Sequence, residues 1–371
     1  MTKLFYVPIE SLPERYSESW YRNFPPVFGK YGYNVVIVGG EPLSDHVGVG
    51  TFLDINSTTH FKFNQLQKIA LSFHNHLIKN GDVFFIADME FWGLESIRLM
   101  AQMNNIKVKI FSFLHAASYT TEDAFAIAEP YQKYTELGWL MACDKVFVGS
   151  NYHKQAVIDR RIKPYAAAED VKSLSDKLCV TGNPLFKEDY TIPGEPIRKK
   201  KKLIISNRFD YEKRPNLSLD FAVILKDRNP DLEIVVTTSR PKFKSNRQWL
   251  VDYAHILEKQ GVIKIYEGLT KLEYHTHLAE SKVMLSNSIE ENFGFCIAEA
   301  LVYNTYPLLK RGLSHSELVD NHSYLLFDNE DEIIEKVDWL LNQQATFDVS
   351  SYAEPYFDSL NRMCRIMGFN D

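Results

Sequence analysis

The feature that most limits the fold of this chain is a regular alternation between short apolar runs and amphipathic stretches. The apolar runs have the composition of buried strands, and the stretches between them, notably 61–80, 94–104 and 131–143, have helical periodicity. This alternation predicts an α/β protein with parallel sheets and crossover helices. The expected strands are 4–7, 35–38, 83–86, 108–113 and 146–148 in the first half, and 203–206, 233–236, 263–266, 283–285, 306–309 and 324–327 in the second.

Length and turn residues together predict two domains. A chain of 371 residues is too long for one ordinary core. Glycine and proline interrupt the periodicity at 182–184 and 193–196, just before a basic run at 198–202. We therefore expect one doubly wound, Rossmann-like domain over 1–185, a linker over 186–202, a second such domain over 203–350, and a helix over 351–371 with the option of returning to the first domain. Ligands bind beyond the carboxyl ends of parallel strands, so the two domains are expected to face a central cleft.

Composition narrows the classes of protein. A hydrophobic content of 45% and a charged content of 24% are those of a soluble globular protein. No apolar run is long enough to predict a membrane span, and the N-terminus lacks the pattern of a secretory signal, so we expect a cytoplasmic protein. The four cysteines are scattered without paired spacing, which argues against a zinc site or a disulfide framework. We expect neither a metal nor a cofactor.

Charge gives one local hint of a polyanionic partner. The net charge of −6 excludes a globally basic nucleic-acid-binding protein, but Arg198 and the four lysines at 199–202 form a concentrated basic run. Beside Pro193 and Pro196, the same run is more typical of a solvated interdomain linker.

The stretch 288–301 carries the strongest chemical signal. It places Glu291 and Glu299 on either side of a turn, with seven residues between them. An apolar strand precedes the turn and helix-forming residues follow it, so Gly294 is expected at a helix N-terminus, where unbonded backbone N–H groups attract anions and hydroxyls. One carboxylate would then lie on the loop and the other inside the helix, suited to the two ends of an elongated polar ligand. Helix capping alone is the competing explanation.

A second charged motif lies earlier in the same predicted domain. Arg208 and Lys213 follow the expected strand 203–206 directly. A guanidinium and an ammonium at a strand end could hold a diphosphate, although charged loops are common.

Arg208 and Lys213, followed by Glu291-Asn-Phe-Gly-Phe and Glu299-Ala, resemble the donor-site signature of retaining nucleotide-sugar glycosyltransferases of the GT-B fold. The resemblance covers the second half well and the first half mainly by topology. It implies that Arg208 and Lys213 bind the donor diphosphate, that Glu299 binds the ribose, and that Glu291 holds the transferred sugar. The implied donor-binding set is Arg208, Lys213, Glu291, Asn292, Phe293, Gly294, Phe295 and Glu299, with a UDP-sugar as the expected donor.

The resemblance also implies how the reaction proceeds. The acceptor attacks on the face from which the diphosphate departs, and the leaving phosphate helps to take the acceptor proton, so no dedicated protein base is required. The chain contains no Asp-X-Asp motif, in agreement with metal-independent transfer. His115, directly after the expected strand 108–113, matches a histidine that contacts the donor sugar in the family, and it joins Glu291, Arg208 and Lys213 as a catalytic candidate. A structural hydrogen bond is the alternative for His115.

The opening of the chain departs from the family, because a loop of Glu, Arg, Tyr and Trp replaces the usual Gly-Gly loop. By resemblance this loop faces the acceptor, which makes Glu10, Arg15, Tyr16 and Trp20 acceptor-side candidates. The loop is similar to the opening of glycosyltransferases encoded by bacteriophages, some of which modify DNA. Aromatic and basic residues could hold a flipped base and phosphates. Packing of the first helix is the competing role, above all for Trp20.

These observations lead to one expected function and several rivals. We expect a glycosyltransferase whose acceptor is a 5-hydroxymethylated pyrimidine in phage DNA. A bacterial surface glycan or a lipid-linked molecule is the rival acceptor. A sugar-nucleotide epimerase would bind the same donor but needs a further acid/base pair, and a binding module without catalysis is the third alternative.

Overall fold

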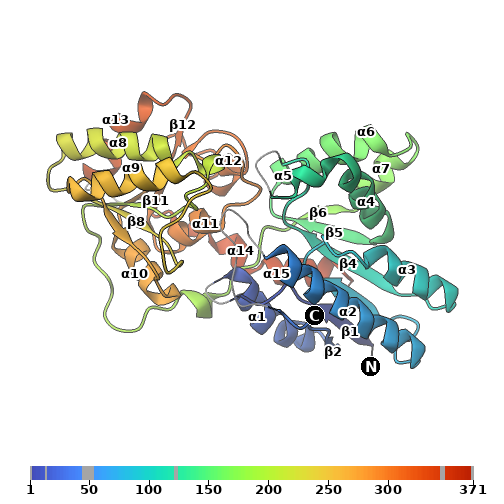
Figure 1. The fold of residues 1–371 in the computed structure, drawn as a ribbon. Helices are drawn as coiled ribbons and strands as arrows, with labels where there is room; N and C mark the ends of the chain where they lie inside the picture. The colour runs from blue at the N-terminus through green and yellow to red at the C-terminus, as the bar shows by residue number, and fades with distance from the viewer. Residues whose placement is uncertain (1, 13–14, 44–53, 121–123, 343–346, 369–371) are drawn as a thin grey trace. The chain divides into compact units, whose positions relative to one another are not determined.

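The computed structural model describes residues 2–12, 15–43, 54–120, 124–342 and 347–368. The chain folds into two compact units, which Figure 1 shows in ribbon form. The first unit comprises Met1–Phe186 and Asp358–Asp371, and the second comprises Lys187–Phe357. Each unit contains a six-stranded sheet in which every pair of neighbouring strands is parallel. Two parallel α/β domains are therefore present, as the alternation of strands and helices predicted.

The sheet of the first unit has the strand order β2-β1-β3-β4-β5-β6. Its strands are β1 (Lys3–Val7), β2 (Asn34–Ile37), β3 (Val83–Ile86), β4 (Lys109–Leu114), β5 (Lys145–Val148) and β6 (Leu178–Val180). Its helices are α1 (Tyr16–Lys30), α2 (Ile55–His74), α3 (Leu94–Met103), α4 (Glu129–Ala142), α5 (Asn151–Val157), α6 (Lys163–Tyr165), α7 (Asp170–Ser175) and α15 (Ser359–Ile366), with short helical turns at η1 (Ala124–Ala128) and η2 (Ile158–Ile162). The direction of strand addition reverses between β1 and β3, which is the topological switch point of this sheet.

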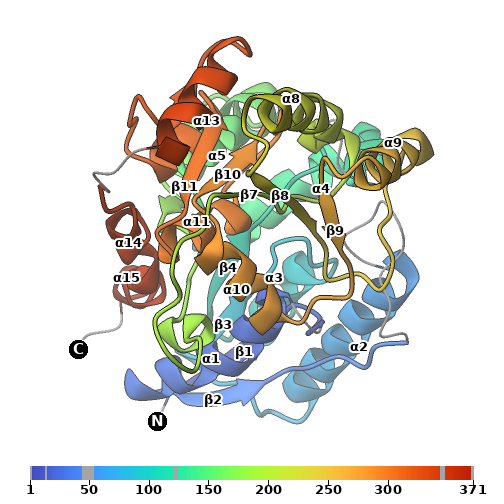
Figure 2. The same cartoon turned by 90° about the vertical axis from the view of Figure 1, so that its left-hand side faces the viewer.

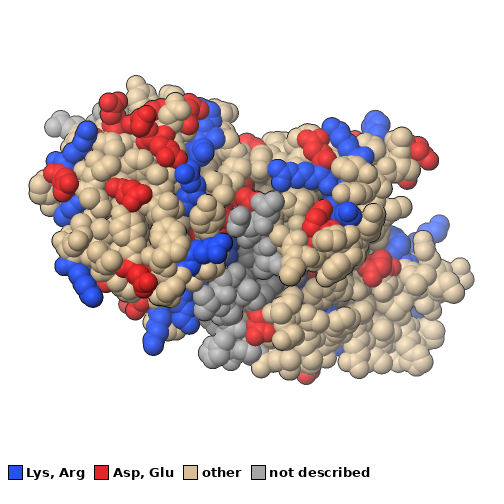
Figure 3. All heavy atoms as spheres, turned by 45° about the horizontal axis from the view of Figure 1, so that its top comes forward, with Lys and Arg blue, Asp and Glu red and all other residues tan. Residues whose placement is uncertain are grey.

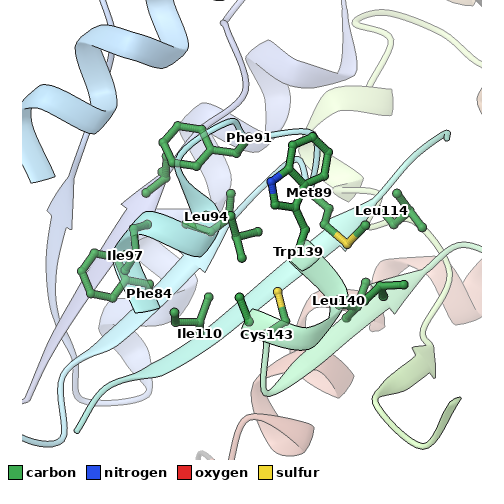
Figure 4. Packing of buried hydrophobic residues seen from close by; sticks show 14 of the residues in the cluster. Phe84, Met89, Phe91, Leu94, Ile97, Ile110, Leu114, Trp139, Leu140 and Cys143 are labelled. Carbon is green, nitrogen blue, oxygen red and sulfur yellow. The ribbon is translucent and has the colours of Figure 1, made fainter. Parts of the chain in front are cut away.

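The central strands of the first unit form its core. All four residues of β3 are buried, because a parallel strand covered by helices on both faces has no solvent-facing side. Figure 4 shows Phe84 and Ile110 of the sheet packed with side chains of α3 and α4. Trp139 of α4 belongs to this cluster, and its indole Nε1 donates to Glu95 Oε2 over 2.8 Å. This bond joins α4 to α3, and both helices pack against the sheet.

The sheet of the second unit has the strand order β12-β11-β10-β7-β8-β9, most of which is visible in Figure 2. Its strands are β7 (Lys202–Ile205), β8 (Glu233–Thr237), β9 (Lys264–Tyr266), β10 (Val283–Ser286), β11 (Tyr306–Lys310) and β12 (Leu326–Phe327). Its helices are α8 (Pro215–Arg228), α9 (Gln248–Lys259), α10 (Lys271–Glu280), α11 (Phe295–Val302), α12 (His315–Leu318), α13 (Glu332–Asn342) and α14 (Glu354–Phe357), with turns at η3 (Lys187–Tyr190), η4 (Tyr211–Lys213) and η5 (Ser350–Tyr352). The switch point here lies between β7 and β10.

Several element boundaries differ from the predicted ones. Helix α2 begins at Ile55 rather than at 61, because the side chain of Asp54 caps it by accepting a hydrogen bond from the Ser57 N–H over 2.9 Å. The three-residue strand β6 was not predicted. The opening segment, in which Tyr16 and Trp20 were expected to lie on a loop, is already helical from Tyr16 onward in α1.

The division into units also differs from the predicted linker. Residues 187–202 belong to the second unit, and the predicted C-terminal helix is split, with α14 in the second unit and α15 in the first. Helix α15 packs against α1, and Ser359 Oγ donates to the carbonyl of Thr181 over 2.7 Å.

On the face shown in Figure 3, basic and acidic side chains occur together on both units. No helix within the described part of the chain is long and apolar enough to cross a membrane. The described residues also contain no group of three or more His, Cys, Asp or Glu side chains placed to hold a metal ion.

Candidate active site

The predicted donor residues lie at the switch point of the second sheet. Strands β7 and β10 are neighbours, and the chain leaves their carboxyl ends in opposite directions, so a crevice for ligands is expected there. Arg208 follows β7 and Glu291 follows β10. The loops are joined by the Ile289 N–H, which donates to the carbonyl of Glu212 over 2.9 Å. Two motifs about 80 residues apart in sequence are thus brought together by topology.

Lys213 and Glu291 form the centre of this site. Lys213 Nζ lies 2.9 Å from Glu291 Oε2 and also donates to the carbonyl of Glu290 over 3.1 Å. Both side chains are mostly buried, with exposed fractions of 12% and 17%. Burial alone would raise the pKa of Glu291, but the charge and hydrogen bond of Lys213 outweigh it, and the pKa of Glu291 is lowered. The site therefore holds a carboxylate and an ammonium side by side.

Arg208 is held in place by two carboxylates of its own loop. Its Nη2 lies 2.7 Å from Glu212 Oε1, and its Nη1 lies 3.4 Å from Asp210 Oδ2. The guanidinium is 26% exposed, whereas both acids are nearly buried. The positive charge of Arg208 contributes to the lowered pKa of Glu291, which places the two groups in the same electrostatic environment.

Gly294 begins helix α11 as predicted. Its φ of 94° and ψ of 70° lie in the left-handed region that favours glycine. A Cβ added here would lie 2.9 Å from Ile297 Cδ1 and 3.3 Å from Glu291 Cγ, so the position leaves no room for a side chain. Ser314 secures the same turn, because its Oγ donates to the carbonyls of Glu291 (3.1 Å) and Phe293 (3.0 Å). The turn is thus fixed from two sides.

The remaining predicted members of the turn differ in their surroundings. Phe293 is 5% exposed and packs against Phe295 and Tyr356, with ring centroids 5.3 and 4.9 Å apart. Its side chain therefore contributes to the core of the unit. Asn292 and Phe295 are half-buried beside it.

Glu299 lies in α11 and has a different environment from Glu291. Tyr274 of α10 donates its hydroxyl to Glu299 Oε2 over 3.2 Å. Burial raises the pKa of Glu299 to about 7, because the attraction of Lys271 and the hydrogen bond of Tyr274 offset the desolvation only in part. Glu291 and Glu299 therefore differ in pKa, which is lowered in the first and raised in the second.

The structure adds residues to the site that the sequence did not suggest. Burial, together with the negative charges of Glu291 and Glu299, raises the pKa of the Cys296 thiol to about 12. Its Sγ donates to Asn207 Oδ1 over 2.9 Å, and Asn207 in turn donates to Ser286 Oγ over 2.9 Å. Asn207 directly precedes Arg208 at the strand end, and this position could have marked it as a site residue. Nothing in the sequence indicated that Asn207 contacts Cys296 and Ser286.

His315 is a further unpredicted member of the site. It is fully buried and interacts electrostatically with both Glu291 and Lys213. Its Nδ1 lies 2.9 Å from the carbonyl of Lys310, and a carbonyl only accepts, so Nδ1 carries the proton. Its Nε2 has no hydrogen-bond partner within the described residues.

In the first unit, His115 follows β4 at the carboxyl edge, as predicted. Its Nε2 donates to the carbonyl of Ala87 over 3.0 Å, and its ring packs against Phe113, Trp20 and Tyr16 with centroids 4.8, 5.1 and 5.4 Å apart. Burial lowers the pKa of His115, although the negative charge of Asp88 opposes this effect. The structural hydrogen bond considered as the alternative is present, and it fixes the tautomer of the ring.

The opening residues proposed for the acceptor side have structural partners. Glu10 is 4% exposed and accepts hydrogen bonds from Ser57 Oγ (3.3 Å) and Thr58 Oγ1 (2.8 Å) at the start of α2. Trp20 is 1% exposed, and its Nε1 donates to the carbonyl of Pro184 over 3.1 Å. Trp20 is therefore packed in the interior of the first unit, which is the competing role considered for it.

Tyr16 and Arg15 lie at the beginning of α1. Burial raises the pKa of Tyr16, and the charge of Asp88 raises it further. Tyr16 thus lies close to the groups that follow β3, while Arg15 is half-exposed as the N-cap residue.

The four lysines of the basic run at 198–202 have partners in the second unit, whereas Arg198 is exposed. Lys199 Nζ is largely buried and donates to Thr305 Oγ1 (2.6 Å) and to the carbonyl of Ser281 (2.7 Å). Lys200 and Lys202 both pair with Glu280, the latter over 2.9 Å, and Lys201 pairs with Asp231 over 2.8 Å. The lysines tie the start of β7 to neighbouring elements, which is a structural role for them, and binding of DNA by the run stays a prediction.

Comparison with known proteins relates this geometry to a family. Residues 188–354 match the family described as glycosyl transferases group 1, a range that spans nearly all of the second unit. Over 201 residues the chain is 23% identical to the tRNA-queuosine alpha-mannosyltransferase of Drosophila melanogaster. That alignment covers 50% of this chain and 52% of the relative, so the chain spans about half the length of the curated relative that it matches.

Solved structures resemble this chain over almost its whole length. Sucrose-phosphate synthase from Thermosynechococcus elongatus matches with a TM-score of 0.67 at 10% identity, covering 99% of this chain and 98% of that one. Anabaena HepE in complex with UDP-glucose matches with 0.61 at 12% identity, covering 99% of each chain. The lipopolysaccharide outer core galactosyltransferase WaaB matches with 0.62 at 13% identity, also over 99% of each. These likenesses confirm the predicted fold class of two Rossmann-like domains, and the family match supports the predicted glycosyltransferase class.

Proposed function

We propose that this protein is a glycosyltransferase that moves a sugar from a nucleotide diphosphate donor to a hydroxyl acceptor, with retention of the anomeric configuration. The observation that carries the proposal is the Lys213–Glu291 pair at the switch point of the second sheet, beside Arg208 and within the range that matches the glycosyl transferases group 1 family. A cation and a carboxylate held together at the strand ends suit a ligand with a diphosphate at one point and sugar hydroxyls at the next.

Each donor residue has a role that its environment supports. Arg208 and Lys213 bind the diphosphate, since a guanidinium fork and an ammonium form strong charge-assisted hydrogen bonds with phosphate oxygens. Glu291 remains ionised and accepts hydrogen bonds from the transferred sugar. Glu299 binds the ribose hydroxyls, farther along the same helix.

The reaction follows from where charge develops. The bond between the anomeric carbon and the phosphate oxygen breaks, the acceptor oxygen bonds to that carbon on the same face, and the acceptor proton passes to the departing diphosphate. Negative charge therefore grows on the phosphate, and preorganised cations such as Arg208 and Lys213 are the groups that stabilise it. His115 contributes as a neutral ring that contacts the sugar.

For the donor we infer a UDP-sugar. Anabaena HepE and the pneumococcal O-GlcNAc transferase GtfA, whose folds this chain shares, were solved with UDP or UDP-glucose. We further propose that transfer needs no divalent metal, because the cations that meet the leaving diphosphate are side chains.

For the acceptor we propose a hydroxyl on a modified nucleoside within a polynucleotide. The similarity to a tRNA-queuosine alpha-mannosyltransferase favours an acceptor of this kind. The hydroxymethylated pyrimidine of phage DNA remains one member of that class, although Lys200, Lys201 and Lys202 of the basic run are already paired with Glu280 and Asp231. A surface glycan or a lipid-linked acceptor is the rival, and nothing in the geometry favours an epimerase.

A two-step experiment tests this proposal. Thermal-shift measurements with UDP-, GDP- and ADP-sugars should identify one donor class that raises the melting temperature. That donor, radiolabelled and supplied in EDTA, is then incubated with unmodified and queuosine-containing tRNA, and with DNA containing cytosine or hydroxymethylcytosine. We expect label on a modified polynucleotide and on neither unmodified control. Stabilisation by no nucleotide sugar, together with no transfer in EDTA or magnesium, would contradict the proposal.

A further inference from the structure

Tyr274 of α10 contacts the donor site of the second unit without belonging to the sequence signature. Its hydroxyl donates to Glu299 Oε2 of α11 over 3.2 Å, and the two helices pack side by side (Figure 2). Tyr274 lies 25 residues before Glu299 in a different helix, so no motif in the sequence pointed to it.

The hydrogen bond from Tyr274 leaves part of the Glu299 carboxyl group available to a ligand. Among the residues that the structure describes, Tyr274 is the one that hydrogen-bonds the Glu299 side chain. An ionised carboxylate can accept about four hydrogen bonds. Because Glu299 is also partly exposed, Oε1 remains open to a hydroxyl donor from outside the protein.

The N-terminus of α10 is fixed by a capping box. Thr270 Oγ1 accepts a hydrogen bond from the Glu273 N–H over 3.3 Å, and Glu273 Oε2 accepts one from the Thr270 N–H over 2.8 Å. This cap lies one turn before Tyr274, so the backbone that carries the tyrosine is held in place.

The C-terminus of α10 is fixed by the basic run. Lys199 Nζ donates to the carbonyls of Leu278 (3.3 Å) and Ser281 (2.7 Å), where cations are favoured at a helix end. Lys202 Nζ lies 2.9 Å from Glu280 Oε2. The lysines that the donor site does not use therefore tie the helix of Tyr274 to the start of β7.

The charges around Glu299 give the Tyr274 hydroxyl a large influence on it. The titratable groups that face Glu299 are Lys271 and Tyr274 of α10, Asp189 and Tyr190 of η3, Cys296 of α11, and Tyr303 at the end of α11. Burial has the largest effect and raises the pKa of Glu299 to about 7, against the attraction of Lys271 and the hydrogen bond of Tyr274. Loss of the hydroxyl would therefore raise this pKa further, because the bond favours the charged form.

We propose that Tyr274 is a positioning residue for donor binding, which holds Glu299 as an oriented carboxylate and leaves Oε1 to a hydroxyl of the donor ribose. This inference rests on the proposed function, in which Glu299 binds the ribose. Tyr274 itself does not contact the donor and acts through Glu299 alone.

The test compares Tyr274→Phe with wild type in binding an intact nucleotide sugar, at pH 7 and at pH 9. The ligand is whichever of UDP-glucose, GDP-mannose and ADP-glucose the wild type binds. If the pKa of Glu299 rises by about one unit, the ionised fraction at pH 7 falls about fivefold, whereas at pH 9 nearly all of it is ionised. We therefore expect affinity about fivefold weaker at pH 7 and at most about twofold weaker at pH 9.

The matched control is Tyr253→Phe, which removes a tyrosine hydroxyl that donates to Asp220 Oδ1 over 2.8 Å elsewhere in the second unit. It should bind the donor as the wild type does at both pH values. An NMR titration of the carboxyl carbon of Glu299, assigned by its absence in Glu299→Gln, measures the same pKa without a donor and should show the rise in Tyr274→Phe.

An effect on folding would weaken binding equally at pH 7 and pH 9, and that result would overturn the inference. An unchanged titration of Glu299 in Tyr274→Phe would overturn it as well. If the wild type binds a nucleotide sugar and Tyr274→Phe behaves identically, this inference alone fails. If the wild type binds none of the three, the proposed function fails, and this inference fails with it.

Discussion

Two carboxyl groups of one short motif are tuned in opposite directions by their nearest partners. Glu291 and Glu299 are both partly buried, and burial raises the pKa of either group. Glu291 has Lys213 at 2.9 Å, which is enough to lower its pKa. Glu299 has a tyrosine hydroxyl rather than a cation as its hydrogen-bond partner, so its pKa stays raised at about 7. Near neutral pH, a small change in pH or the binding of a ligand therefore decides whether Glu299 is neutral or ionised.

Donor binding should depend on pH through Glu299. Ribose hydroxyls donate to a carboxylate, so the ionised form binds the donor, and with a pKa of about 7 roughly a tenth of Glu299 is ionised at pH 6. We expect an intact nucleotide sugar to bind about tenfold more weakly at pH 6 than at pH 8, because only the competent fraction binds. Calorimetry in buffers of different ionisation enthalpy should also detect a proton released on binding.

The Glu299→Gln variant is the control for this pH effect, and it should bind the donor more weakly with no slope between pH 6 and pH 8. Glu291→Gln should keep the slope and the affinity for the nucleotide but lose turnover, since Glu291 is assigned to the sugar. An unchanged slope in Glu299→Gln would rule out the ribose assignment.

The stability of the fold should depend on pH with the opposite sign to donor binding. The folded pKa of Glu299 is raised above 4.5, so its contribution is present below pH 4.5 and is lost as the pH rises to about 7.

At the scale of elements, the site depends on how helix α11 begins. The left-handed turn at Gly294 points the loop before it toward Lys213, and Ser314 holds that loop by two hydrogen bonds to its carbonyls. The motif in the sequence was sufficient to predict the turn and the helix start, because glycine at such a position has few other uses. The support from Ser314 was not predictable, since it comes from a different loop of the sheet.

Replacing Gly294 by alanine should therefore damage both stability and donor binding. A left-handed residue with a Cβ costs about 1–2 kcal/mol, and the new methyl group would press on Ile297 and on Glu291 Cγ. Gly261 also has positive φ, 71°, but a Cβ there meets nothing within 4 Å. We expect Gly261→Ala to lower the melting temperature and leave donor affinity intact, whereas Gly294→Ala lowers both. Equal donor affinities in the two variants would show that the turn does not position Glu291.

Boundaries show where local sequence is insufficient. The polar start of α2 concealed six helical residues, because Asp54 stabilises the helix end through its side chain rather than through apolar periodicity. The basic run at 198–202 was interpreted from the sequence as part of a solvated interdomain linker. Its lysines find their acceptors on Glu280 and Asp231, up to about 80 residues away, and only the fold brings these together.

At the scale of the whole molecule, the sequence was sufficient to predict two Rossmann-like domains, because periodicity is a local property that repeats along the chain. The order of the strands was not predictable in the same way, yet it decides the site. The reversal between β7 and β10 brings Lys213 Nζ within 2.9 Å of Glu291 Oε2. The residues of the proposed donor site were therefore visible in the sequence, while their contact with one another required the structure.

The central claim is that the second unit binds a nucleoside diphosphate through side-chain cations. Its most direct test is calorimetric titration of UDP, GDP and ADP, in EDTA, into wild type, Lys213→Ala and Lys264→Ala. Lys264 is exposed at the sheet edge, 3.4 Å from Glu233, and serves as a matched loss of one lysine. A charge-assisted hydrogen bond contributes roughly 1.5–3 kcal/mol, so Lys213→Ala should bind the preferred nucleotide about ten- to a hundred-fold more weakly, with Lys264→Ala unchanged. Equal affinity in wild type and Lys213→Ala, or binding only after a divalent ion is added, would contradict the account.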